Sequence, residues 1–173
     1  YIGVNMTIRY DGKVAIVTGA GGGLGRAHAL GLAARGAKVV VNDLGAESDG
    51  VGSSSVRAES VVEEIKIAGG EAVANGANVG KLDEVEAMVK DVMDTWGRVD
   101  ILINNAGIGH IGNIEKTTEE DLDRVYTVNV KGVYNMLSAG VPAMQNRRQG
   151  VIINMASVAS TVGIADRVAY SLS

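Results

Sequence analysis

Cysteine and phenylalanine are absent from this sequence of 173 residues, and proline occurs once, at Pro142. Without cysteine the chain has no disulfide, no cysteine zinc site and no thiol nucleophile. Its two histidines, His28 and His110, are too few for a histidine-rich centre, so we expect no bound metal. Because only 3% of the residues are aromatic, we expect a core of Val, Ile, Leu, Ala and Met.

Positive charge is also scarce. The chain has 16 Lys and Arg residues and 20 Asp and Glu residues, so its net charge is negative. No basic tract is longer than Arg147-Arg148, which argues against nucleic-acid binding. No apolar run approaches the roughly 18 residues of a membrane-spanning helix, and residues 1–13 lack the apolar stretch of a signal peptide. We therefore expect a cytoplasmic protein that binds neither nucleic acid nor membrane, with residues 1–10 an irregular segment or a tag.

The order of the apolar segments predicts the fold. Short β-branched runs alternate with longer amphipathic stretches, and the run at 38–43 has the continuous apolar pattern of a strand buried on both faces. This alternation predicts one α/β domain over 1–173, a Rossmann-like doubly wound parallel sheet with helices on both faces. Strands are predicted at 14–17, 38–43, 72–74, 101–103 and 151–153. Helices are predicted from the glycine cluster to Gly36, at 56–68 and 82–96, and from a Thr117–Glu120 capping box towards Pro142.

A glycine-rich turn follows the first predicted strand, in the segment Thr18-Gly19-Ala20-Gly21-Gly22-Gly23-Leu24-Gly25. Glycine lets the backbone approach a diphosphate, whose charge then lies on the first amides of the next helix. Asp43 ends the second strand, where its carboxylate can accept hydrogen bonds from both ribose hydroxyls of an adenosine and would repel a 2′-phosphate. The pair predicts an NAD site and disfavours NADP. The alternatives are a plain strand-to-helix turn, a role for Asp43 as a cap of the following loop, and recognition of the ribose by Asn42 or Glu47 instead.

Further motifs resemble those of the short-chain dehydrogenase/reductase family. The glycine turn and Asp43 alone do not select a reaction, because methyltransferases combine similar features. However, the spacing of Thr18, Gly19, Gly23 and Gly25 is similar to the family's cofactor motif, and later segments follow in the family's order over nearly the whole chain. These segments are Asn104-Asn105-Ala106-Gly107, Asn129-Val130-Lys131-Gly132, Asn154-Met155-Ala156-Ser157 and Tyr170.

The resemblance implies hydride transfer between NAD and a secondary alcohol or ketone, and a homo-oligomeric full-length protein. It implies that Tyr170 is the general acid or base, that Ser157 hydrogen-bonds the substrate oxygen, and that Asn129 holds a water in a proton relay. The cofactor-binding residues that it implies are Thr18, Gly19, Gly23, Leu24, Gly25, Asp43, Asn78, Val79, Asn105, Ala106 and Gly107.

Two positions depart from the family pattern. Asn78-Val79 follows the third strand where the family usually has an aspartate that binds the adenine amine, although the Asn78 carbonyl can still accept that hydrogen bond. The family's lysine, four residues after the tyrosine, would follow Ser173, where the sequence ends; its positive charge stabilises the tyrosine's phenolate. We therefore expect this sequence to be part of a longer dehydrogenase, truncated after the fifth strand.

Residues 1–173 alone are expected to show no meaningful turnover, because the lysine that stabilises the phenolate is missing from them. The test is oxidation of a secondary alcohol with NAD by the purified chain. Oxidation at ordinary enzyme rates would contradict the expectation.

The substrate is the part of the function that the sequence constrains least. The segment 40–45 and the following Gly50-Val51-Gly52 resemble the hydroxyacyl-CoA dehydrogenase part of multifunctional enzymes, whereas the chain after Trp96 is closer to sugar- or steroid-acting relatives. A non-catalytic dinucleotide-binding domain, or an inactive fragment, is the alternative function. We expect His110 to face solvent, with contact to substrate as the alternative.

Overall fold

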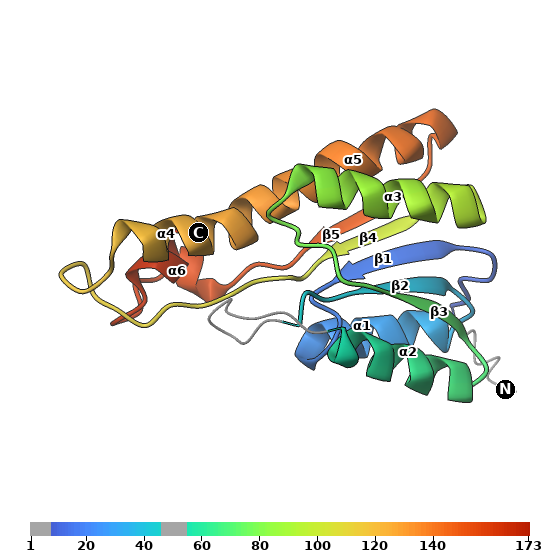
Figure 1. The fold of residues 1–173 in the computed structure, drawn as a ribbon, viewed down its shortest axis with the longest axis horizontal. Coiled ribbons are helices and arrows are strands. Elements are labelled where there is room, and N and C mark those ends of the chain that lie inside the picture. The colour runs from blue at the N-terminus through green and yellow to red at the C-terminus, as the bar shows by residue number, and fades with distance from the viewer. Residues whose placement is uncertain (1–7, 46–54) are drawn as a thin grey trace, which may run out of the picture.

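The computed structural model describes residues 8–45 and 55–173, and shows a five-stranded parallel sheet with helices on both faces (Figure 1). The strand order is β3-β2-β1-β4-β5, so the order reverses between β1 and β4. The strands are β1 (Val14–Thr18), β2 (Lys38–Asn42), β3 (Glu71–Asn75), β4 (Ile101–Asn104) and β5 (Val151–Asn154). The α-helices are α1 (Gly23–Ala33), α2 (Val56–Ile67), α3 (Leu82–Trp96), α4 (Glu119–Tyr126), α5 (Gly132–Arg147) and α6 (Val168–Leu172). This architecture confirms the predicted doubly wound sheet. Across the described ranges no helix is both long and apolar enough to cross a membrane.

Two apolar layers hold the helices on the sheet. α1 and α2 cover one face and α3 and α5 the other (Figure 1). Side chains of a strand alternate between faces, so Val39 and Val41 pack towards α1 and α2 while Val40 packs with the α3 and α5 residues. All three are fully buried, which confirms a strand covered on both faces, although it ends at Asn42 and not at the predicted Asp43.

The helix after β4 starts one residue later than predicted. The Thr118 hydroxyl accepts from the Asp121 backbone N–H at 3.1 Å, and the Asp121 carboxylate accepts from the Thr118 N–H at 3.2 Å, so these two residues form the capping box. The predicted pair, Thr117 and Glu120, has the same spacing. The Thr117 hydroxyl instead donates to the Asn113 carbonyl at 2.8 Å, in the turn before the helix. Sequence spacing alone does not choose between two adjacent threonines.

Two further features of this long helix are absent from the prediction. A π-helical turn, η1 (Thr127–Lys131), joins α4 to α5, and such turns are frequent at functional sites. Pro142 lies inside α5, which continues beyond it to Arg147. Proline removes the hydrogen bond to the carbonyl four residues earlier, on Ser138. Ser138 and Pro142 are both exposed, so water can reach that carbonyl and the helix continues.

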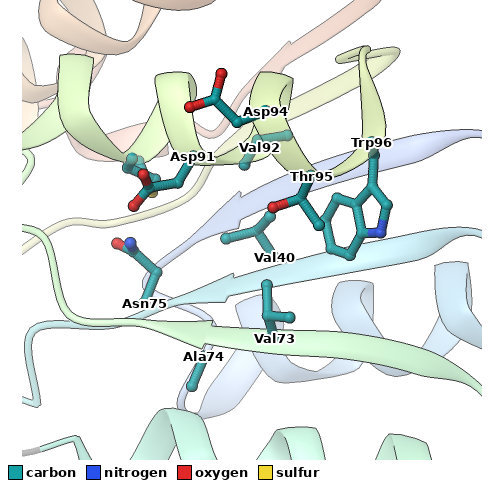
Figure 2. Close-up of a pocket in the computed structure, with 10 residues that line it drawn as sticks. Val40, Val73, Ala74, Asn75, Asp91, Val92, Asp94, Thr95 and Trp96 are labelled. Carbon is teal, nitrogen blue, oxygen red and sulfur yellow. The ribbon is translucent and has the colours of Figure 1, made fainter.

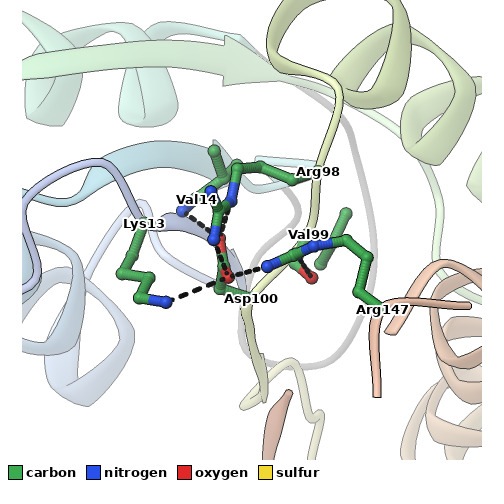
Figure 3. Close-up of polar contacts among 6 residues, drawn as sticks. All are labelled: Lys13, Val14, Arg98, Val99, Asp100 and Arg147. Carbon is green, nitrogen blue, oxygen red and sulfur yellow. Dashed lines mark hydrogen bonds and ion pairs between the residues drawn. The ribbon is translucent and has the colours of Figure 1, made fainter. Parts of the chain in front are cut away.

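A buried carboxylate joins three elements at the amino ends of β1 and β4 (Figure 3). Asp100 accepts two hydrogen bonds of 2.7 Å from Arg98, one of 2.9 Å from Arg147 and one of 2.9 Å from the Val14 backbone N–H, and Lys13 lies 3.7 Å away. Burial on its own would raise the pKa of Asp100. The hydrogen bonds from Arg98, Val14 and Arg147 outweigh burial and hold that pKa well below its usual range. Asp100 is therefore a charged anchor at the end of the sheet opposite the glycine turn.

β5 forms one edge of the sheet, and its residues are exposed along its whole length. Val151, Ile152 and Ile153 are apolar, so this edge combines unpaired backbone groups with apolar surface among the described residues.

Candidate functional site

The carboxyl ends of β1 and β4 are fastened to each other by side chains. The Thr18 hydroxyl accepts from the backbone N–H groups of Asn105 and Ala106, each at 3.0 Å. The Asn105 side-chain amide donates to the carbonyls of Thr18 and Gly19, each at 3.0 Å. Gly19 has a positive φ of 61°, and a Cβ there would lie 2.8 Å from the Ala106 Cα. These residues therefore fix the point where the strand order reverses, which is where ligands bind in such sheets.

The glycine turn leaves the first turn of α1 open to an anion. Gly22 is the N-cap and provides no side-chain hydrogen bond, and the first helical turn contains no acidic residue. Among the described residues, a Cβ at Gly22 or at Gly23 would meet nothing within 4 Å, so these residues leave room above the backbone of both glycines. Free N–H groups at a helix N-terminus attract a phosphate. The residues present thus fit the diphosphate of a dinucleotide cofactor.

Asp43 is held by the backbone on both sides. Its Oδ2 accepts from the Gly21 N–H at 2.8 Å and its Oδ1 accepts from the Gly45 N–H at 2.7 Å, so the carboxylate is oriented between the glycine turn and the end of β2. Asn42, the alternative for ribose recognition, is buried, and its side-chain amide donates to Asn75 and Ala77. Asn42 is therefore occupied in joining β2 to the end of β3. Glu47 and the segment 50–52 lie outside the described residues.

Most of the predicted cofactor residues line a cavity of about 790 Å³. Thr18 and Gly25 are buried behind its wall rather than lining it. The charged residues that line it within the described part of the chain are Asp43, Arg57, Asp123 and Arg124. The predicted cofactor residues that line it are Gly19, Gly23, Leu24, Asp43, Asn78, Val79, Asn105, Ala106 and Gly107.

Asn78 already has a local partner for its side-chain carbonyl, which accepts from the Gly80 N–H at 2.9 Å. Its backbone N–H donates to the Glu84 carboxylate at 2.8 Å. Hydrogen bonds from Lys81 and from the Asn78 backbone lower the pKa of Glu84. Because a carbonyl has two lone pairs, the Asn78 side chain retains one for a ligand. Val79 is buried at the cavity wall, and its own carbonyl accepts from Asn135 at 2.8 Å.

A second cavity, of about 510 Å³, is lined by all three predicted catalytic residues, Asn129, Ser157 and Tyr170. They come from η1, from the segment after β5 and from α6, so only the fold brings them together. The two cavities share a wall, made by Leu24, Asn105, Ala106, Gly107 and Ile108. The predicted cofactor and catalytic residues therefore surround one continuous region at the carboxyl end of the sheet.

Asn129 links three segments around the second cavity. Its Oδ1 accepts from the Ile108 N–H at 2.9 Å, and its Nδ2 donates to the Ile108 carbonyl at 3.1 Å. Nδ2 also donates to the Ser173 hydroxyl at 2.9 Å, which in turn donates to the Tyr170 carbonyl at 3.0 Å. The asparagine thus ties the loop after β4 to the end of the helix that contains Tyr170.

The other polar residues near this site have local partners as well. Ser157 is the N-cap of a 3₁₀ turn, η2 (Val158–Ser160), and its Oγ accepts from the Ala159 N–H at 3.2 Å. The expectation that His110 faces solvent is wrong: its side chain is 15% exposed, and Nδ1 lies 3.6 Å from an Asp121 carboxylate oxygen. His110 packs against the first turn of α4 because Asp121 is held there by the capping box. It is not among the residues that line the 510 Å³ cavity.

A third cavity, of about 360 Å³, lies between α3 and β3 (Figure 2). Val40 and Val73 form its apolar floor, and the side chains of Asp91, Thr95 and Trp96 on α3 surround it. The Trp96 Nε1 donates to Glu71, the first residue of β3, at 2.9 Å. Trp96 therefore lies at the amino end of the sheet, remote from the glycine turn, and its fluorescence is a poor reporter for that site.

Sequence reasoning missed several residues at these cavities. Ile108 forms hydrogen bonds to Asn129 through its backbone N–H and carbonyl, and no side-chain pattern indicates such bonds. Arg57, Asp123 and Arg124 line the larger cavity from α2 and α4, whose approach to the glycine turn depends on the fold. Arg167 lines the 510 Å³ cavity three residues before Tyr170, and that spacing was a usable signal. No group of three metal-ligating side chains occurs in the ranges 8–45 and 55–173.

Comparison with known proteins agrees with this geometry. The sequence profile described as short chain dehydrogenase matches residues 13–173. Peroxisomal multifunctional enzyme A of Dictyostelium discoideum is 50% identical over 158 residues, which cover 91% of this chain and 35% of that protein. The crystal structure of a metagenomic short-chain oxidoreductase in complex with NADP superposes with a TM-score of 0.85 at 35% identity, over 94% of this chain and 70% of that one. A 7α-hydroxysteroid dehydrogenase complexed with NADH and 7-oxo glycochenodeoxycholic acid gives a TM-score of 0.85 at 33% identity, over 95% of this chain and 60% of that one.

The chain spans only part of its curated relatives, with 35%, 18% and 62% of the length covered in three of them. The two solved structures hold NADP in one case and NADH in the other, so the likeness extends to both forms of the nicotinamide cofactor. The family profile extends without interruption over β1, the glycine turn, both cavities and α6. The chain therefore belongs to the short chain dehydrogenase family, a family of oxidoreductases.

Proposed function

We propose that the protein is an NAD-dependent oxidoreductase that interconverts a secondary alcohol and a ketone. The observation that supports this most directly is the shared wall between the cavity with the glycine turn and Asp43 and the cavity with Asn129, Ser157 and Tyr170. A dinucleotide bound over the glycine turn would reach along that wall, and its nicotinamide would supply or accept the hydride. The resemblance of the segment 40–45 to the hydroxyacyl-CoA dehydrogenase part of multifunctional enzymes favours a hydroxyacyl substrate over a sugar or a steroid, and a peroxisomal multifunctional enzyme is among the similar proteins.

Each of the three catalytic candidates has a distinct part in the proposed chemistry. Ser157 donates a hydrogen bond to the reacting oxygen, since the Ala159 N–H already occupies one lone pair of its Oγ and leaves the O–H free to donate. Tyr170 delivers a proton to that oxygen in reduction and removes it in oxidation. Asn129 is a positioning residue, because its amide bonds to Ile108 and Ser173 fix the loop and the helix that flank the cavity.

The preference for NAD rests on Asp43. A carboxylate oriented by the Gly21 and Gly45 N–H groups retains lone pairs for ribose hydroxyls, and its negative charge opposes a 2′-phosphate. NADH is therefore expected to bind at least about tenfold more tightly than NADPH, since hydrogen bonds to a charged group are worth about 1.5–3 kcal/mol. Titration of the chain with each nucleotide, followed by nicotinamide fluorescence, measures the ratio.

The variant Asp43→Ala is expected to lose most of its affinity for NADH. The difference between its affinities for NADH and NADPH is expected to become smaller than in the unmodified chain. Asp91→Ala is the matched control, because it removes an exposed carboxylate of α3 that lies outside the cofactor cavity. Tighter binding of NADPH than of NADH by the unmodified chain would contradict the proposed role of Asp43. Absence of binding by both nucleotides would contradict the proposed function itself.

A further inference from the structure

Among the described residues, the cavity with Ser157 and Tyr170 is lined by one charged side chain, the cation Arg167. The side chains of the other described lining residues are neutral. The Arg167 Nη1 donates to the Asp166 backbone carbonyl at 3.2 Å, and the guanidinium forms no ion pair within the described ranges. An arginine has five N–H donors and no acceptor, so most of its hydrogen-bonding capacity remains available to a bound anion.

The backbone of Arg167 is held in place relative to Tyr170. Arg167 is the N-cap of α6, three residues before Tyr170, and it forms an isolated parallel bridge with Gly112 in the loop after β4. Two hydrogen bonds fasten this bridge: the Gly112 N–H donates to the Asp166 carbonyl at 3.0 Å, and the Val168 N–H donates to the Gly112 carbonyl at 3.2 Å. The cation is therefore part of the cavity wall and not of a free chain end or an isolated loop.

Apolar side chains complete the lining of the same cavity. They lie on α1, on α5, and on the segments after β4 and β5, and they give the cavity a surface suited to a short carbon chain. A substrate in this cavity meets hydroxyl groups where the reaction occurs, apolar surface along its carbon chain and one fixed positive charge. The larger apolar lining residues are Leu24, Ile108, Val133 and Met155, and Ala106 and Ala156 line the cavity as well.

We propose that Arg167 binds an anionic group of the substrate, so that the protein acts on hydroxy or oxo compounds that carry a carboxylate or a phosphate. This inference rests on the proposed oxidoreductase function, and it adds the charge of the substrate and the residue that selects it. A charged ligand group paired with a guanidinium in a partly enclosed cavity gains charge-assisted hydrogen bonds that a neutral analogue lacks. Arg167 thus distinguishes substrates by their charge and not by the length of their carbon chain.

The test is binding of matched probes to the complex of the chain with NADH, followed by ligand-observed NMR. The probes are acetoacetate, its neutral methyl ester and acetoacetyl-CoA, in which the charge lies on phosphates. Acetoacetate is expected to bind about tenfold or more tightly than methyl acetoacetate. Tight binding of acetoacetyl-CoA with weak binding of acetoacetate would assign the anion to a phosphate, and the reverse would assign it to a carboxylate.

Two substitutions identify the residue. Arg167→Gln is expected to reduce binding of the anionic probes about tenfold and to leave methyl acetoacetate unchanged, and Arg167→Lys is expected to restore part of the loss because it keeps the charge without the planar fork. Arg148→Gln is the control, since Arg148 is an exposed cation outside this cavity. NADH affinity is measured for each variant, and an unchanged value shows that the fold and the cofactor site are intact.

If NADH binds, three results would contradict the proposed role of Arg167 and leave the proposed oxidoreductase function standing. These are binding of methyl acetoacetate as tight as that of both acetoacetate and acetoacetyl-CoA by the unmodified chain, an equal loss for charged and neutral probes in Arg167→Gln, and absence of saturable binding of every probe. Failure of NADH to bind would instead contradict the proposed function.

Discussion

Replacement of Gly25 by alanine is expected to abolish detectable cofactor binding and to lower the free energy of unfolding by about 3 kcal/mol, at the upper end of the usual cost of overpacking. A Cβ at this position would collide with the Gly19 carbonyl and would lie 2.5 Å from the Asn105 Nδ2. Both groups belong to the contacts that join the ends of β1 and β4. Backbone cannot yield as a flexible side chain does, so α1 has to move away from the sheet and the glycine turn moves with it.

Gly31→Ala is the matched control on the same helix. Of the residues in 8–45 and 55–173, its Cβ would meet only the Arg35 Nη1, at an ordinary 3.6 Å, so this substitution should raise the free energy of unfolding by up to about 1 kcal/mol through helix propensity. Urea unfolding and NADH titration of both variants separate the two effects. Wild-type binding by Gly25→Ala would show that the close approach of α1 to β1 is not required.

Replacement of Asp100 by alanine is expected to lower the free energy of unfolding at pH 7 by about 3 kcal/mol, the low end of the cost of breaking a buried ion pair. The low end applies because the Asp100 side chain is only 6% exposed while its cationic partners Arg98 and Arg147 keep part of their surface in water. Removal of the carboxylate takes this acceptor from Arg98 and the Val14 N–H, and leaves the Arg147 guanidinium with its 3.3 Å hydrogen bond to the Val99 carbonyl. Cofactor affinity should change little, because Asp100 lies at the end of the sheet opposite the glycine turn.

The loss of unfolding free energy in Asp100→Ala should become smaller as the pH falls. The folded-state pKa of Asp100 is depressed, so its contribution is fully present above the unfolded value of about 4 and disappears as the pH falls through the folded-state pKa. Urea unfolding at pH 7 and at pH 3 should therefore show a smaller difference between wild type and Asp100→Ala at the lower pH. Asp11→Asn, which alters an exposed pair with Arg9, should give no measurable change at either pH. A difference that grows on acidification would contradict the assignment.

Much of the fold follows from local sequence signals. Continuous β-branched runs predict the buried strands because such side chains fit a sheet covered on both faces, and β2 has that environment. The apolar spacing of residues 82–96 predicts α3, whose buried residues lie on one face. Elements at the surface were located less well, since adjacent threonines offered equivalent caps and the π-helical turn has no sequence signature of its own.

The predicted site residues gather at one end of the sheet, but their contacts do not follow from the motifs. Asn129 bonds to the Ile108 backbone and to Ser173, and both contacts depend on how η1 packs against distant segments. The cation Arg167 enters the cavity because its loop pairs with Gly112, more than 50 residues earlier in the chain. Motif spacing locates reactive residue types, whereas the fold decides which neighbours surround them.

β4 is pinned at both ends by polar side chains that belong to different parts of the molecule. Asp100 precedes its first residue and binds cations, and Asn105 follows its last residue and binds the turn after β1. A loop at the carboxyl end therefore attaches to a backbone whose position is already set from the amino end. Substitutions in the loop after Asn105 are therefore expected to leave the hydrogen bonds of Asp100 at the other end of the strand intact. For protein engineering, residues after the carboxyl end of β4 are therefore the ones to vary, and Asp100 at its amino end is the one to keep.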